Sequence, residues 1–135
     1  MNPSNCVIPT LRYRDAHAAI AWFKAVFGFV DRLVVPNETG GVQHAQLTLG
    51  GGMIMLGSAN PEKLRLRGMQ ADAGAPSCYL MVRDVDATHA RALAHGGREI
   101  TAPEDQHYGG RLSLVADPEG YLWAVGSYDP WVELA

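Results

Sequence analysis

Few side chains of this sequence combine the type and the spacing that chemistry requires, and His44 is the foremost of them. Segment 44–49 alternates polar and apolar residues, which is the period of a strand with two unlike faces, and its polar members are His44, Gln46 and Thr48. An imidazole changes charge near neutral pH, so His44 can transfer a proton or bind a ligand. A plain hydrogen bond to a neighbour is the alternative. The catalytic residue stays unknown from the sequence, with His44 as the best candidate.

Other reactive arrangements are missing. The sequence has no Gly-x-Ser-x-Gly turn, and neither Cys6 nor Cys78 has an evident histidine partner, so a nucleophilic triad has no support. The two cysteines form no Cys-x-x-Cys pair and lie in apolar stretches, which predicts reduced, buried thiols. Arg12 and Arg111 can each hold a carboxylate or phosphate through paired hydrogen bonds, or can pair with an acidic residue across a sheet.

The composition is that of one globular domain. The chain has 135 residues, of which 47% are hydrophobic and 19% charged, and its net charge is −3. No basic run indicates nucleic-acid binding, and no stretch approaches the roughly 18 apolar residues of a membrane span. We expect a soluble cytoplasmic protein that contacts neither nucleic acid nor membrane.

The chain resembles itself when it is shifted by 69 residues. The shift places Asp15 on Asp84 and Gly28 on Gly97, and it continues without a gap into the last strand-like segment of each half. The aspartates stand where the N-caps of helices at about 16–27 and 85–95 belong. The glycines stand at the C′ positions that end those helices. The shift therefore predicts a duplicated unit.

These elements predict an α+β domain of two tandem βαβββ repeats. Strands are expected at about 7–13, 29–35, 42–49 and 53–58, and again at about 78–82, 98–101, 111–116 and 121–126. Repeat one spans about 5–58, a linker 59–76, and repeat two about 77–127. We expect one curved eight-stranded mixed sheet, with helices on its convex face and a ligand cleft on its concave face.

Four segments resemble the vicinal oxygen chelate superfamily, which includes glyoxalase I, extradiol dioxygenases and bleomycin resistance proteins. The four segments are residues 7–11, which precede Asp15, and residues 22–28, 44–47 and 117–123. The last, Asp-Pro-Glu-Gly-Tyr-Leu-Trp, is the sharpest, because the family's final strand commonly begins with Asp-Pro-x-Gly and a hydrophobic pair. The resemblance covers nearly the whole chain, and its motifs are specific for the superfamily and for no single activity.

The resemblance also bears on metal binding. The family's enzymes hold a divalent metal through His, Gln or Glu at equivalent strand positions that face the cleft. The residues at these positions here are Ile8, Met55, Ser77 and Ala124. None of these side chains is a ligand for a hard divalent metal. The resemblance therefore implies no metal site and no cofactor in this chain.

Strand alternation, anchored on those family positions, predicts the side chains that line the cleft. The predicted ligand-binding residues are Thr10, Arg12, His44, Gln46, Met53, Met55, Tyr79, Met81, Arg111, Ser113 and Leu122. The set is apolar and rich in sulfur with a few polar anchors, as small-molecule pockets are. Packing in the core is the alternative for Met53 and Met55. Trp123 alternates onto the helix side and is predicted to belong to the core.

Two specific functions fit this set, and a housekeeping homodimer of unknown ligand is a third, less specific alternative. The first is a glyoxalase/bleomycin-resistance-like protein that lacks the usual metal ligands and binds a small, partly aromatic or hydrophobic molecule, such as an antibiotic or a toxic metabolite. The second is a lyase, isomerase or dioxygenase of the same superfamily, acting through His44 or through a displaced metal site that includes His44 and His107. Fold analogy leaves open which ligand is bound and whether any reaction is catalysed.

The expected assembly is a homodimer. An open sheet has edges that need cover, and the tail at 131–134 offers apolar surface. The linker is long enough for the halves to pair within one chain or between two, and the second arrangement is a domain swap.

Overall fold

The computed structural model describes residues 7–59 and 78–131, and the chain divides into two compact units, Met1–Ala75 and Pro76–Ala135. The first contains β1 (Thr10–Tyr13), α1 (Ala16–Phe27), β2 (Val30–Pro36), β3 (Val42–Leu49) and β4 (Gly52–Ser58). The second contains β5 (Cys78–Met81), α3 (Val85–Ala94), β6 (Arg98–Asp105), β7 (Arg111–Ala116) and β8 (Leu122–Gly126). The predicted pair of βαβββ repeats is confirmed. The predicted linker, apart from Ala59, lies outside the described residues.

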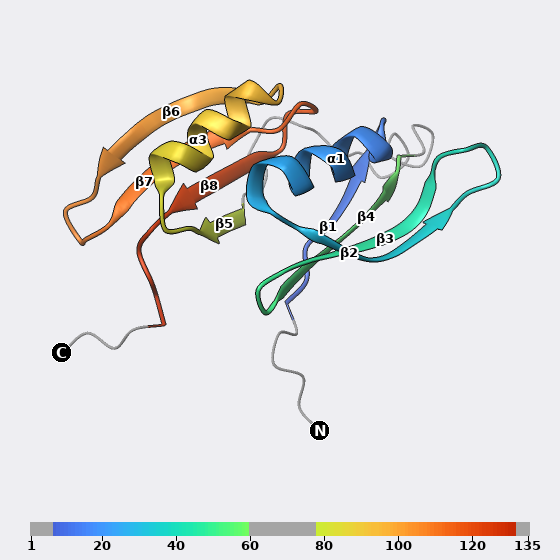
Figure 1. Ribbon diagram of the computed structural model, residues 1–135, viewed down its shortest axis with the longest axis horizontal. Helices are drawn as coiled ribbons and strands as arrows, with labels where there is room; N and C mark the ends of the chain where they lie inside the picture. The colour runs from blue at the N-terminus through green and yellow to red at the C-terminus, as the bar shows by residue number, and fades with distance from the viewer. Residues whose placement is uncertain (1–6, 60–77, 132–135) are drawn as a thin grey trace, which may run out of the picture. The chain divides into compact units, whose positions relative to one another are not determined.

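Each unit has its own four-stranded mixed sheet. The strand orders are β1-β4-β3-β2 and β5-β8-β7-β6. In each sheet the first strand runs parallel to its neighbour, and the remaining pairs are antiparallel. Figure 1 shows that each helix lies over one face of the sheet of its own unit. We call the opposite face of each sheet its helix-free face.

Both helices begin at the predicted aspartates. The side chains of Asp15 and Asp84 each accept the backbone N–H group three residues further on, at 3.0 Å. Helix α1 ends at Gly28, whose φ of 85° lies in the left-handed region that favours glycine. The second helix ends one residue earlier than predicted, because Gly96, with φ of 95°, adopts this conformation in place of Gly97. No helix in the described part of the chain has the length and apolar character of a membrane span.

The core of the first unit lies between α1 and its sheet. Phe23 is fully buried and its ring contacts those of Tyr13, Trp22 and Phe29, with centroids 5.4–6.1 Å apart. The side chains of β3 and β4 that face the helix are at most 3% exposed: Ala45, Leu47, Ile54 and Leu56. Because strand residues alternate, their neighbours in sequence point to the helix-free face.

The core of the second unit centres on Trp123, as predicted. Its side chain is 1% exposed, and its indole Nε1 donates to Asp117 Oδ2 at 3.1 Å. Asp117 Oδ1 accepts the backbone N–H groups of Glu119 and Tyr121 at 3.0 and 3.1 Å. One buried carboxylate thus closes the Asp-Pro-Glu-Gly turn and anchors the indole. This double contact explains why the motif joins an aspartate to a tryptophan six residues later.

We predict that Trp123→Ala lowers the free energy of unfolding by about 3–5 kcal/mol, because it removes a buried ring from a packed core. Trp123→Phe keeps a ring but leaves the Asp117 carboxylate without the indole donor, and should cost about 1–3 kcal/mol. Urea unfolding followed by circular dichroism measures both values. A loss below about 1 kcal/mol for Trp123→Ala would place the indole outside the core.

Candidate functional site

A single extra residue in β3 determines which side chains the first sheet presents. Val35 of β2 pairs with His44, but the next residue, Pro36, pairs with Val42, so Gln43 is a β-bulge. Because one inserted residue reverses the facing of the strand beyond it, the polar residues from His44 onward point away from α1.

The second unit has no such bulge in β7. A uniform shift of 69 residues matches His44 with Ser113. The strand pairing instead matches His44 with Leu112, because His44 pairs with Val35 and Leu112 pairs with Glu104, the residue 69 positions after Val35. By the strand register, residues 117–121 of the second unit correspond to 49–52 of the first, five residues against four. This one extra residue restores the 69-residue shift in β8. The prediction that the repeat continues without a gap is therefore wrong, since two one-residue differences cancel each other.

This difference corrects two predicted ligand residues, Arg111 and Ser113. Ser113 pairs with Val125 and is 0% exposed, so it lies on the face that α3 covers. Arg111 donates from Nε and Nη2 to Asp86 of α3, at 2.9 and 3.1 Å, and from Nη1 to Asp105 of β6, at 3.1 Å. Its guanidinium therefore joins the helix to the hairpin and belongs to the scaffold. Leu112 and Leu114 occupy the helix-free face in their place.

The predicted ligand residues of the first unit do share the helix-free face. Residues paired across a sheet point to the same side, and Met55 pairs with both Thr10 and Gln46. Arg12 pairs with Gly57, and its guanidinium occupies the space that a β-carbon at residue 57 would need. The described members of this face include Thr10, Arg12, His44, Gln46, Thr48, Met53 and Met55.

A chain of hydrogen bonds crosses this face and was not predicted. Arg32 Nη1 donates to Gln46 Oε1 at 2.6 Å, and Gln46 Nε2 contacts His44 Nε2 at 3.1 Å. An arginine can only donate, so it fixes which end of the Gln46 amide is oxygen. The amide nitrogen must then donate to His44, which places the imidazole hydrogen on Nδ1. Arg32 escaped prediction because it is the residue skipped where β2 changes register between Asp31 and Leu33.

The helix-free face of the second unit is largely apolar. Tyr79 pairs with Ala124 and Met81 with Gly126, and these two side chains are 40% and 47% exposed. Leu122 points to the same side. Tyr79, Met81 and Leu122 therefore lie on the face that strand alternation predicted for them. The other described members are Leu112, Leu114 and Ala124.

The described residues at the expected metal positions are Ile8, Met55 and Ala124, and their side chains offer no oxygen or nitrogen ligand. Met55 and Ala124 lie on the helix-free faces and offer a thioether and a methyl group, and Ile8 is half-buried and aliphatic. Ser77 lies outside the described residues. Within 7–59 and 78–131, no group of three His, Cys, Asp or Glu side chains is placed to hold a metal ion.

Cys78 is the described cysteine; it is a half-buried free thiol and pairs with Trp123 on the neighbouring strand. Burial raises the pKa of its thiol, so the reactive thiolate is disfavoured at neutral pH. The second predicted cysteine, Cys6, lies outside the described residues. Cys78 is thus a free thiol, as predicted, but it is half-buried where the sequence predicted a buried one.

Comparisons with known proteins agree with this architecture. Residues 6–125 match the family model of the glyoxalase/bleomycin resistance protein/dioxygenase superfamily. The chain is 36% identical over 129 residues to Mb0911c, an uncharacterized protein of Mycobacterium bovis, covering 93% of this chain and 85% of that protein. The crystal structure of TioX from Micromonospora sp. ML1 is 31% identical, with a TM-score of 0.68 and coverage of 89% and 95%. A bleomycin resistance determinant encoded on transposon Tn5 shares the fold at 22% identity, with a TM-score of 0.62 and coverage of 91% and 97%.

We predict that Arg111→Leu lowers stability at neutral pH and weakens the acid sensitivity of the protein. The hydrogen bonds from Arg111 hold the pKa of Asp86 below its ordinary value of 3.8, so this stabilisation is present above pH 3.8 and is lost as the pH falls below it. Urea midpoints at pH 7 and near pH 3 should therefore differ less in the variant than in the wild type. Arg98→Leu, at the start of β6, is the control, and an equal loss of stability at both pH values would contradict the role of Asp86.

Proposed function

The chain belongs to the glyoxalase/bleomycin resistance protein/dioxygenase superfamily, and from that premise we propose that it binds a small, partly aromatic or hydrophobic molecule without a metal. An antibiotic or a toxic metabolite in the cytoplasm has the required character. The observation that carries the proposal is the chemistry of the helix-free faces. At the positions where a metal enzyme of this family has its ligands, these faces carry Met55 and Ala124. The side chains around them are polar or apolar groups that can contact a ligand without forming a covalent bond.

The first helix-free face carries polar side chains that can anchor a ligand. Because Gln46 occupies the Nε2 lone pair of His44, the imidazole offers its Nδ1–H as a donor to a carbonyl, phenolate or carboxylate of the ligand. The bond from Arg32 to Gln46 fixes the amide and, through it, the orientation of the ring. Met53 and Met55 lie on the same face and can adapt to the shape of the bound molecule.

The second helix-free face, taken by itself, offers apolar contact to a ligand. Leu112, Leu114 and Leu122 are half-buried and present branched side chains, and Met81 is exposed beside them. An exposed apolar surface of this kind is favourable for an aromatic or aliphatic ligand, since contact removes both surfaces from water.

Proton transfer by His44 in a lyase or isomerase is the second candidate function. The observation that favours it is the fixed orientation of the imidazole, which a general base requires. The same hydrogen bond weighs against it, because Nε2 must lose the Gln46 donor before it can accept a proton. Binding needs no such rearrangement and is therefore the better supported proposal.

A thermal-shift screen of antibiotics, 2-oxo acids and glutathione conjugates tests the proposed binding, because a ligand of the folded state raises Tm by mass action. We expect a hit to shift Tm equally with and without a chelator. His44→Ala should weaken its binding about tenfold, the loss of one buried hydrogen bond. His95→Ala, an exposed histidine after α3, is the matched control. Stoichiometric metal in protein purified without chelator, with the Tm shift lost on its removal, would contradict metal-free binding.

We also propose that the protein is a homodimer, either with or without exchange of its halves. Strand β2 ends the first sheet and carries apolar side chains, Val30, Leu33 and Val34, that are 38–62% exposed. A second copy that covers such an edge would remove this surface from water. Analytical ultracentrifugation at micromolar concentration should show a dimer, and a monomer there would refute this proposal.

A further inference from the structure

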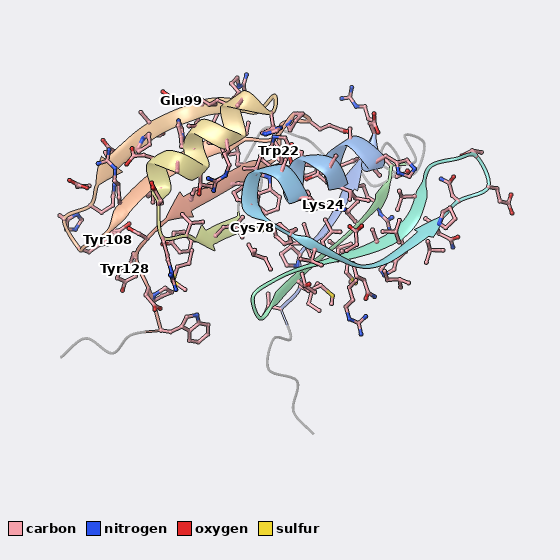
Figure 2. All side chains as sticks on the ribbon, viewed as in Figure 1. Trp22, Lys24, Cys78, Glu99, Tyr108 and Tyr128 are labelled. Atoms are coloured by element: carbon pink, nitrogen blue, oxygen red, sulfur yellow. The ribbon has the colours of Figure 1, made fainter. Side chains whose placement is uncertain are left out.

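Two tyrosine rings meet at one end of the second unit. Tyr108 lies in the turn between β6 and β7, and Tyr128 lies two residues after β8. Their ring centroids are 5.1 Å apart with the planes tilted by 49°, and Figure 2 shows the two side chains next to each other. Tyr108 is 47% exposed, so this pair is open to a ligand.

A third tyrosine joins them from the helix-free face. The hydroxyl of Tyr79 donates to the backbone carbonyl of Tyr128 at 2.7 Å, and the edge of its ring fills the space above Gly126. Burial raises the pKa of Tyr79, and nearby Tyr108 and Asp129 raise it further, so the phenol is neutral at physiological pH. We call Tyr79, Tyr108, Tyr128 and Asp129 the tyrosine cluster.

The fold does not require these rings. The same backbone contact occurs beside the β6–β7 turn of the second unit and the β2–β3 turn of the first. In the second unit Arg111 N donates to Ser127 Oγ, and in the first Val42 N donates to Ser58 Oγ, both at 2.9 Å. The repeat positions that correspond to the three tyrosines are Thr10, Thr39 and Ala59. The same backbone forms in the first unit without any aromatic side chain there, so the rings are free to serve binding.

The described part of the second unit carries a net negative charge. Residues 78–131 contain eight Asp or Glu and four Arg, and one of these arginines, Arg111, is held by Asp86 and Asp105. Asp129 directly follows Tyr128, and its Oδ1 accepts the backbone N–H group of Trp131 at 2.9 Å, while its charge raises the pKa of Tyr79. A negative field raises the local concentration of cations, and aromatic faces attract them.

We propose that the tyrosine cluster binds a cationic ammonium group of the ligand whose apolar part contacts the second helix-free face. This inference rests on the proposed binding function and specifies the class of molecule as a hydrophobic or aromatic amine. A tertiary or quaternary ammonium suits the cluster best, because it is weakly hydrated and gains more from aromatic rings than from hydrogen bonds. Asp129 adds a direct charge attraction that a neutral ligand does not gain.

The test compares two probes of the same shape, 3-hydroxyphenyltrimethylammonium and 3-tert-butylphenol, titrated into the full-length protein. Tyrosine ring resonances in two-dimensional NMR report the site and the affinity. The cation should bind about two- to fivefold more tightly than its neutral isostere, the range of an exposed cation–π contact. The shifts should be largest at Tyr108 and Tyr128.

Variants assign the preference to the cluster. Tyr108→Leu should lower the ratio of the two affinities, leaving the charge attraction of Asp129, while Tyr108→Phe, which keeps the ring, should retain the wild-type ratio. Asp129→Asn should lower the ratio, and Glu38→Gln in the turn between β2 and β3 is the matched control for lost charge. Equal affinity of both probes for the wild type, a ratio unchanged by Tyr108→Leu, or no binding of either probe would overturn the proposal. If the neutral probe binds as well as the cation, only this inference fails, whereas the ligand screen with and without chelator decides the proposed function itself.

Discussion

Side chains on a β-strand alternate between two faces, so one inserted residue reverses the facing of every residue beyond it. In the first unit that residue is Gln43, and the chemistry of the helix-free face depends on it. The bulge directs His44 and Gln46 away from α1, while Ala45 and Leu47 remain in the core. Without it, the helix would have to cover an imidazole and an amide, and burial of unpaired polar groups is costly.

The two units use one scaffold for different surfaces. In the first, Arg32, Gln46 and His44 form a hydrogen-bonded chain beside two methionines. In the second, Leu112 and Leu114 occupy the equivalent strand positions, and tyrosines stand where the first unit has small residues. The helix N-caps and the serine contacts beside the first turn of each hairpin are alike in the two units, whereas the exposed strand positions differ.

Local signals made much of this predictable from the sequence. Asp15 and Asp84 begin their helices because a carboxylate satisfies free N–H groups wherever a helix starts. Trp123 was assignable to the core because its strand alternates cleanly. Arg111 and Ser113 were assigned to the wrong face because each unit has one extra residue, the first in β3 and the second in the turn before β8. The two halves therefore keep the same overall spacing of 69 residues, and a comparison of their sequences shows neither insertion. Arg32 was missed because it lies where β2 changes register, and only the paired strand shows where that is.

The facing of β3 and β7 can be measured directly by cysteine accessibility. In a background with Cys6→Ser and Cys78→Ser, single cysteines are placed at 44, 45, 112 and 113, and the rate of modification by a thiol reagent is recorded for the folded protein. The account predicts rapid modification at 44 and 112 and protection at 45 and 113, since Ala45 and Ser113 are both 0% exposed. Modification at 113 as fast as at 112, with 44 protected, would contradict the bulge at Gln43 and the assignment of both helix-free faces.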